Sequence, residues 1–164
     1  MSFTFYKDLS DFLECLNNEK VEYMVVGGYA VILHGYNRTT GDLDIWVKNS
    51  KENYDKLVKS LYRFGIPGDL VPFEQFINNQ YTDVFTFGRA PLAIDIMTQV
   101  KGLEFDQAYK NVKKINIDKK TVNIIDYREL IMAKKAANRF KDLNDIQQLN
   151  IVNKKNKSDK EPLI

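Results

Sequence analysis

Val25-Val-Gly-Gly-Tyr-Ala30, followed by Gly41-Asp-Leu-Asp-Ile-Trp46, carries the clearest structural signal in this chain. Both parts contain short apolar runs typical of buried strands, and a glycine pair ends the first run. Alternate side chains of a strand share a face, so Asp42 and Asp44 project together, roughly 6.5 Å apart at Cα for a rise of ~3.3 Å per residue. The apolar side chains between them point the opposite way, into a core. Two neighbouring carboxylates need a counter-charge, and their hard oxygens suit Mg²⁺ or Mn²⁺.

A third carboxylate occurs in a similar run, Pro91-Leu-Ala-Ile-Asp-Ile-Met97. Asp95 is the only charge in this apolar segment, and an unpaired carboxylate is not normally tolerated in such a place. If this strand lies beside that of Asp42 and Asp44, the three carboxylates converge. Such a cluster can hold two metal ions about 3.5–4 Å apart, an arrangement that catalyses phosphoryl transfer.

These residues resemble the nucleotidyltransferase superfamily typified by DNA polymerase β, and more narrowly its small stand-alone bacterial members. The resemblance runs from about Val21 to Leu149. Its motifs are Gly27-Gly28, His34-Gly35, Arg38-Thr39-Thr40, Asp42-x-Asp44, Asp95, Phe105-Asp-Gln-Ala108 and Leu130-Ile-x-x-Lys134…Arg139-x-Lys141-Asp142. Many members have Gly-Ser where this chain has Gly-Gly, a version similar to that of tRNA-end nucleotidyltransferases. We interpret the difference as variation, since all three carboxylates are present.

The pattern and the resemblance together define a candidate site. Its catalytic and metal-binding residues are Asp42, Asp44 and Asp95, which would hold two Mg²⁺ or Mn²⁺ ions. Its nucleotide- and phosphate-binding residues are Gly27, Gly28, Arg38, Lys134 and Arg139, and its further pocket residues are His34, Thr40 and Lys141. Glycines at the start of a helix allow close approach of backbone N–H groups to phosphate, and Asp95 is also a candidate base for the acceptor hydroxyl.

Each of these residues also has a purely structural interpretation. Taken alone, Gly27-Gly28 is a turn. The carboxylates could form salt bridges to Arg38, Lys134 or Arg139, and Arg38 could equally support an aspartate. A lone histidine such as His34 on an apolar helix is more often structural than catalytic.

The resemblance implies transfer of a nucleoside monophosphate from an NTP to a hydroxyl acceptor, with release of pyrophosphate. The acceptor could be an RNA end such as that of tRNA, a protein or a small molecule. A non-catalytic nucleotide-binding or antitoxin-type protein with the same fold is the alternative, because some relatives belong to toxin–antitoxin and abortive-infection systems and pair with a partner protein. A metal-dependent phosphodiesterase is a third, weaker interpretation.

Composition sets the remaining limits. The 164 residues, 44% of them hydrophobic, suit one domain, expected over 1–152, with a disordered basic tail over 153–164. The net charge of +2 is accounted for by the Lys-rich tail, so no large basic surface for duplex nucleic acid is expected. A single cysteine excludes an intramolecular disulfide. With no apolar signal segment and no membrane span, a cytoplasmic protein without membrane partners is expected.

Hydrophobic periodicity predicts a chain that contains both strands and helices. The resemblance implies the nucleotidyltransferase fold, an α/β (α+β) architecture in which helices flank a mixed central β-sheet. Strands are expected over 21–26, 42–47, 82–87, 92–98, 113–117 and 121–125. Helices are expected over 5–16, 29–34, 51–64, 71–80, 105–111, 126–139 and 142–150. Ser50 caps one helix, and Asp126 with Glu129 forms a capping box for another.

Overall fold

The computed structural model describes residues 3–80 and 83–160. The strands are β1 (Tyr23–Val26), β2 (Asp42–Val47), β3 (Val84–Phe87), β4 (Ala93–Met97), β5 (Lys113–Ile117) and β6 (Lys120–Ile124). The helices are α1 (Lys7–Asn18), α2 (Gly27–Leu33), α3 (Lys51–Phe64), α4 (Phe73–Ile77), α5 (Phe105–Tyr109), α6 (Tyr127–Ala137) and α7 (Phe140–Ser158), with a 3₁₀ turn η1 at Gly68–Leu70. Thr82, expected to open a strand, lies outside the described residues.

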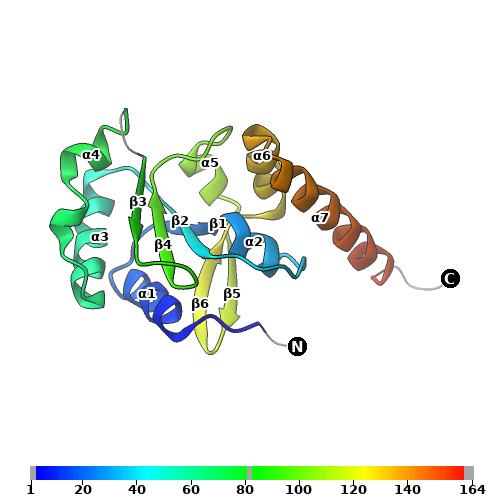
Figure 1. Ribbon diagram of the computed structural model, residues 1–164, viewed down its shortest axis with the longest axis horizontal. Coiled ribbons are helices and arrows are strands. Elements are labelled where there is room, and N and C mark those ends of the chain that lie inside the picture. The colour runs from blue at the N-terminus through cyan, green and yellow to red at the C-terminus, as the bar shows by residue number, and fades with distance from the viewer. Residues whose placement is uncertain (1–2, 81–82, 161–164) are drawn as a thin grey trace.

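The strands form one mixed sheet in the order β3-β4-β2-β1-β6-β5. β2 runs antiparallel to β1 and parallel to β4, while β3 is antiparallel to β4 and β1 is parallel to β6. Helices flank this sheet, with α3 and α4 at one end of the view and α6 and α7 at the other (Figure 1). The mixed α/β architecture expected from the sequence is therefore confirmed.

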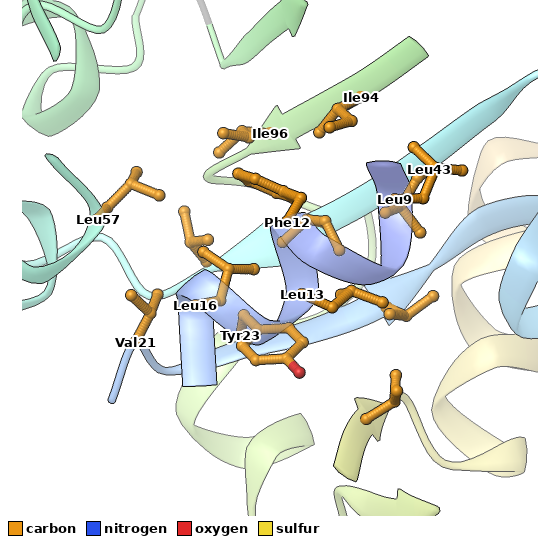
Figure 2. Packing of buried hydrophobic residues seen from close by; sticks show 14 of the residues in the cluster. Leu9, Phe12, Leu13, Leu16, Val21, Tyr23, Leu43, Leu57, Ile94 and Ile96 are labelled. Atoms are coloured by element: carbon orange, nitrogen blue, oxygen red, sulfur yellow. The ribbon is translucent and has the colours of Figure 1, made fainter. Parts of the chain in front are cut away.

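One face of the sheet packs against α1 and α3. The α1 side chains Leu9, Phe12, Leu13 and Leu16 lie against the strands, where Leu43 is buried (Figure 2). Ile45, Ile94 and Ile96 belong to the same cluster, so the alternating pattern of β2 and β4 places their apolar residues as expected. Nearly complete burial of these side chains supplies the main stabilisation of the fold.

The opposite face of the sheet carries a second apolar cluster and the charged residues. Met24, Trp46, Phe105, Leu130 and Leu149 pack there, from β1, β2, α5, α6 and α7. Because Asp42 and Asp44 alternate with buried Leu43 and Ile45, they lie on this second face. The helices α5, α6 and α7 therefore pack on the face of the sheet that carries the carboxylates.

The C-terminal region differs from the prediction. Helix α7 begins at Phe140 and ends at Ser158, so residues 153–158, expected to form a disordered tail, are helical. Lys154, Lys155 and Lys157 lie in its last turns, where the negative end of the helix dipole favours cations. Residues 161–164 of the expected tail lie outside the described residues. The helix projects from the body of the molecule (Figure 1).

Helix caps follow the sequence only in part. Ser50 accepts a hydrogen bond from Asn53 N, as expected for a cap of α3. Asp126 caps α6 through Arg128 N, but Glu129 accepts from Asn111 instead of completing the predicted capping box. None of the described helices combines the length and apolar character needed to cross a bilayer.

Candidate active site

The site is built around two carboxylates on neighbouring strands. Asp44 of β2 and Asp95 of β4 are directly paired in the parallel register, and Asp42 pairs with Ala93 at one end. On the far side, Thr86 of β3 lies opposite Asp95, and its hydroxyl donates a hydrogen bond to Asp95 Oδ1 at 2.6 Å. The sheet therefore brings the sequence-predicted carboxylates together on one face.

Asp44 is the most perturbed of these groups. Burial, followed by the negative charges of Asp95 and Asp42, raises the pKa of Asp44 from its ordinary value of 3.8 to about 7. Lys134 acts in the opposite direction without offsetting these effects. The face therefore carries more negative charge than its surroundings neutralise, which is the electrostatic setting of a cation-binding or catalytic site.

The glycine turn lies directly against Asp44. Gly27, with φ of +65°, opens α2, and a Cβ atom added there would lie 2.0 Å from Asp44 Oδ2. A Cβ atom added at Gly28 would lie 2.5 Å from Thr40 Oγ1 and 3.1 Å from Arg38 Nη2. Only glycine permits this close approach, and at position 27 only glycine adopts the backbone conformation without strain.

Arg38 and Lys134 converge on Asp145, an acidic residue of α7. Arg38 Nε lies 2.9 Å from Asp145 Oδ1, and its Nη2 donates to Oδ2 at 3.0 Å. Lys134 Nζ lies 2.9 Å from the same Oδ2. Asp145 is 1% exposed, so these are buried ion pairs that connect the loop before β2 with α6 and α7.

Asp142, one helical turn earlier, extends this network. Lys134 Nζ donates to Asp142 Oδ1 at 3.1 Å, and Arg139 Nε donates to Oδ2 at 2.7 Å. Burial raises the pKa of Asp142, but hydrogen bonds from Arg139 and Lys134 outweigh it and the net pKa is lowered. Salt bridges from Arg38, Lys134 and Arg139 to the sheet carboxylates were the structural alternative, but these residues pair with Asp142 and Asp145 of α7. Asp42, Asp44 and Asp95 are therefore without those partners.

Asp142 and Asp145 were not recognised as site residues from the sequence, although Asp142 belongs to the motif that carries the family resemblance. Their spacing of three residues, on a helix that also buries Leu149, is the available signal. Thr86 was also missed. A threonine on an edge strand is ordinary, and only the register with Asp95 distinguishes it.

A cavity of about 200 Å³ lies between the sheet, α6 and the segment after β4. Asp44, Gly27, Lys134, Arg139 and Asp142 line its polar side. The apolar side is formed by Val26, Met97, Val100, Leu130, Ala133 and Ala137. A small pocket lined by both charged and apolar groups suits a ligand that has both characters.

The other sequence candidates lie outside this lining. His34 Nε2 is 2.7 Å from Ile125 O, and because a carbonyl only accepts, this nitrogen carries the proton. Burial lowers the pKa of His34, so the ring is neutral at pH 7. Thr40 packs on Gly28, and Lys141 is exposed on α7. Neither His34 nor Lys141 therefore lines the cavity that contains Asp44.

The donor set fits a divalent cation. Asp44 and Asp95 offer hard oxygens side by side, and the raised pKa of Asp44 reflects negative charge that a cation would neutralise. Within residues 3–80 and 83–160, no three His, Cys, Asp or Glu side chains form a ready cation cage. Mg²⁺ is commonly held by one or two carboxylates together with substrate phosphates, and this open geometry is compatible with that mode.

The sheet order, the glycine turn and the paired carboxylates define a nucleotidyltransferase-type protein. Residues 6–158 match the family described as "Nucleotidyltransferase of unknown function (DUF6036)". The chain belongs to this family and is a nucleotidyltransferase-type enzyme. Comparison with curated proteins gives no match.

Among solved structures, the fold is similar to that of a lincosamide antibiotic adenylyltransferase, LnuA, in its lincomycin-bound form. The TM-score is 0.57 and the identity 16%, and the match covers 91% of this chain and 98% of that one. At this identity the similarity concerns the fold.

Proposed function

We propose that the chain transfers a nucleoside monophosphate from an NTP to a hydroxyl acceptor, using the face formed by Asp42, Asp44 and Asp95. The observation that carries the proposal is the direct pairing of Asp44 with Asp95 beside Gly27. Structural ion pairs do not explain these carboxylates, because Arg38, Lys134 and Arg139 are paired with α7.

The transfer forms a bond between the acceptor oxygen and the α-phosphorus and breaks the bond from that phosphorus to the bridging α–β oxygen. Pyrophosphate leaves, and the acceptor proton passes to Asp95, whose position is fixed by the Thr86 hydroxyl. Asp42, Asp44 and Asp95 would hold two Mg²⁺ or Mn²⁺ ions. When bound, such ions neutralise phosphate charge and polarise the phosphoryl group.

The basic residues divide into two roles. The side chain of Arg139 is 61% exposed and lines the 200 Å³ cavity, so it is available to a triphosphate even while it contacts Asp142. Lys134 is 5% exposed and held by two carboxylates. We therefore assign Arg139 as a phosphate contact, and Lys134 as a fixed positive charge at the wall of the cavity. Arg38 with Thr40 supports the Gly28 turn, and Lys141 remains a proposed acceptor or nucleotide contact at the rim.

Acceptor identity separates the candidate functions. LnuA is described as acting on lincosamide antibiotics, and by analogy a small-molecule acceptor joins RNA and protein as a candidate here. The competing proposal is a non-catalytic member that binds nucleotide and a toxin–antitoxin partner. The weaker third proposal is a phosphodiesterase, which would hydrolyse diesters without preference for triphosphates.

The decisive experiment incubates the protein with α-labelled ATP, CTP, GTP or UTP, Mg²⁺ or Mn²⁺, and a fractionated lysate. Asp44→Asn is compared with Asp55→Asn, an exposed residue of α3 paired with Lys51. We expect label in one fraction with wild type and Asp55→Asn, and at least a 100-fold loss with Asp44→Asn.

Equal labelling by Asp44→Asn would contradict the site assignment. A folded wild-type protein that labels no fraction would instead favour the non-catalytic proposal. Turnover of a diester without triphosphate would favour the phosphodiesterase.

A further inference from the structure

A larger cavity, of about 830 Å³, opens at the ends of β2 and β4. Its walls come from the end of β2, from Asn79 and Asp83, from the segment after β4 and from the start of α5. Its polar and charged lining residues include Lys48, Asn49, Asp83, Thr98, Glu104 and Asp106. The single tryptophan, Trp46, also lines it. The volume is in the range typical of small-molecule sites.

This cavity adjoins the candidate active site. Gln99, Val100 and Lys101 line both the 830 Å³ cavity and the 200 Å³ cavity that contains Asp44. Trp46 and Met97 are the next residues on the same strand faces as Asp44 and Asp95. A ligand in the larger cavity therefore lies about one strand repeat beyond the carboxylates, roughly 6–7 Å along the strands.

The lining contains polar oxygens that the protein itself does not use. Thr98 is 5% exposed, and its Oγ1 is buried without a hydrogen-bond partner among the described residues. The same holds for Asn49 Oδ1, although Asn49 Nδ2 donates to Ile77 O at 3.3 Å. Both oxygens are covered by neighbouring protein atoms. Because buried polar groups are normally hydrogen-bonded, two unpaired oxygens on residues of one lining indicate a ligand that supplies donors once the covering side chains move aside.

The charges of the lining favour the same kind of ligand. Its ionisable residues are three acids, Asp83, Glu104 and Asp106, and two lysines. Lys48 is already paired with Asp106 at 3.0 Å, which leaves two acids, Asp83 and Glu104, against one lysine, Lys101. Carboxylates repel phosphates, which disfavours both the triphosphate and a nucleic-acid backbone in this cavity.

We infer that the 830 Å³ cavity binds the acceptor, and that the acceptor is a small molecule bearing hydroxyl and amino groups. This inference rests on the proposed function. One hydroxyl of the acceptor reaches the carboxylates past Gln99–Lys101 and attacks the α-phosphorus as described above. The amino and remaining hydroxyl groups donate to Asp83, Glu104, Thr98 and Asn49.

The first test measures binding alone and needs no catalysis. Glucosamine, glucose and glucose 6-phosphate differ mainly in charge, and each is titrated into ¹⁵N-labelled protein. The indole N–H of Trp46, which donates to Thr98 O at 3.3 Å, gives one unambiguous signal at the cavity. We expect glucosamine to bind at least 5-fold more tightly than glucose, and glucose 6-phosphate to bind least. The same order is expected in Asp44→Asn.

Substitutions in the lining of the 830 Å³ cavity test whether its residues cause the preference for glucosamine over glucose. Asp83→Asn and Glu104→Gln should each reduce the preference for glucosamine over glucose at least 3-fold, and Thr98→Val should weaken both sugars. Asp118→Asn, at the β5–β6 turn outside the lining, should change nothing. Equal or tighter binding of the phosphate, or no shift at Trp46 and Thr98 with any probe, would overturn the inference.

Transfer distinguishes failure of this inference from failure of the proposed function. Label from NTP that appears in a small-molecule lysate fraction, and falls at least 5-fold with Asp83→Asn, supports the acceptor assignment. Label confined to RNA or protein overturns the assignment while leaving the transferase intact. If the sugars bind but no fraction is ever labelled, the proposed function has failed, and the cavity is not an acceptor site.

Discussion

Asp44 and Asp95 are direct neighbours on parallel strands, and the pair lies on a face whose nearby cations are already bound to α7. Burial, then the charges of Asp95 and Asp42, raises the pKa of Asp44 to about 7. A protein that served only stability would not keep this arrangement, since like charges side by side oppose folding. The cost is characteristic of functional sites.

Asp44→Asn should therefore stabilise the cation-free protein at alkaline pH. The folded pKa, about 7, lies above the ordinary value of 3.8, so the contribution of Asp44 to stability is complete below pH 3.8 and is lost as pH rises through 7. Asparagine does not titrate. We expect the variant to be more stable than wild type by roughly 1–2 kcal/mol at pH 8, less than the full shift implies because the group is partly solvated.

Urea unfolding in EDTA at pH 8 and at pH 4 measures this difference, which should shrink at the lower pH. Asp55→Asn, on the exposed surface of α3, serves as the control and should match wild type within about 0.5 kcal/mol at both pH values. Equal stabilities of wild type and Asp44→Asn at pH 8 would show that the face is not electrostatically strained.

A divalent cation together with a non-hydrolysable NTP should make wild type more stable than Asp44→Asn, the reverse of the order expected without a cation. A ligand that binds only the folded state stabilises it by about 2.7 kcal/mol at 100 times its Kd. We expect Mn²⁺ plus the analogue to raise the Tm of wild type, and to leave that of Asp44→Asn nearly unchanged. The cation alone should have a smaller effect, because the carboxylates do not form a complete cage. A shift of equal size in both proteins would remove Asp44 from the cation site.

Gly27→Ala should abolish transfer and reduce stability. The new Cβ would lie 2.0 Å from Asp44 Oδ2, and φ of +65° is unfavourable for alanine. Gly65→Ala is a matched control, because Gly65 has φ of +96° but no atom within 4 Å of an added Cβ. We expect Gly65→Ala to cost about 1 kcal/mol with transfer intact, and Gly27→Ala to cost more. Similar unfolding energies and activities in both variants would contradict the close approach.

Asp145→Asn should destabilise the protein by about 3 kcal/mol, because it removes the shared partner of the partly buried Arg38 and of the buried Lys134, which keeps only Asp142. Asp55→Asn again provides the contrast between a buried and an exposed ion pair. Chemical denaturation measures both effects. A loss below 1 kcal/mol for Asp145→Asn would indicate that the two basic side chains find other partners.

The sheet was predictable because its strands carry local signals. Apolar alternation around Asp42, Asp44 and Asp95 gives both the strands and the face of each carboxylate, and the structure agrees. The partners of Arg38 and Lys134 were not predictable in this way. Asp145 lies 107 residues from Arg38, and only the docking of α7 onto α6 brings them together.

The prediction for the end of α7 was wrong for a different reason. Residues 153–158 are polar, so hydrophobic periodicity predicts no structure there, but lysine and asparagine continue a helix that is already nucleated by its buried first turns. The sequence likewise did not establish which strands are neighbours, and convergence of the carboxylates was predicted only if their two strands lie side by side. That β4 lies beside β2, and Thr86 beside Asp95, depends on the order of the whole sheet.

His34→Gln tests whether the only histidine is structural. Burial lowers the pKa of His34, so its contribution to stability is present above the ordinary value of 6.5 and is lost as pH falls through the folded value. Glutamine keeps a neutral N–H donor for Ile125 O and does not titrate. We expect the variant to match wild type within about 1 kcal/mol at pH 7.5, to lose less stability between pH 7 and pH 5, and to retain transfer. Urea titrations across this pH range and the labelled-NTP assay measure these outcomes, and a 100-fold loss of transfer with stability unchanged would place His34 in the active site instead.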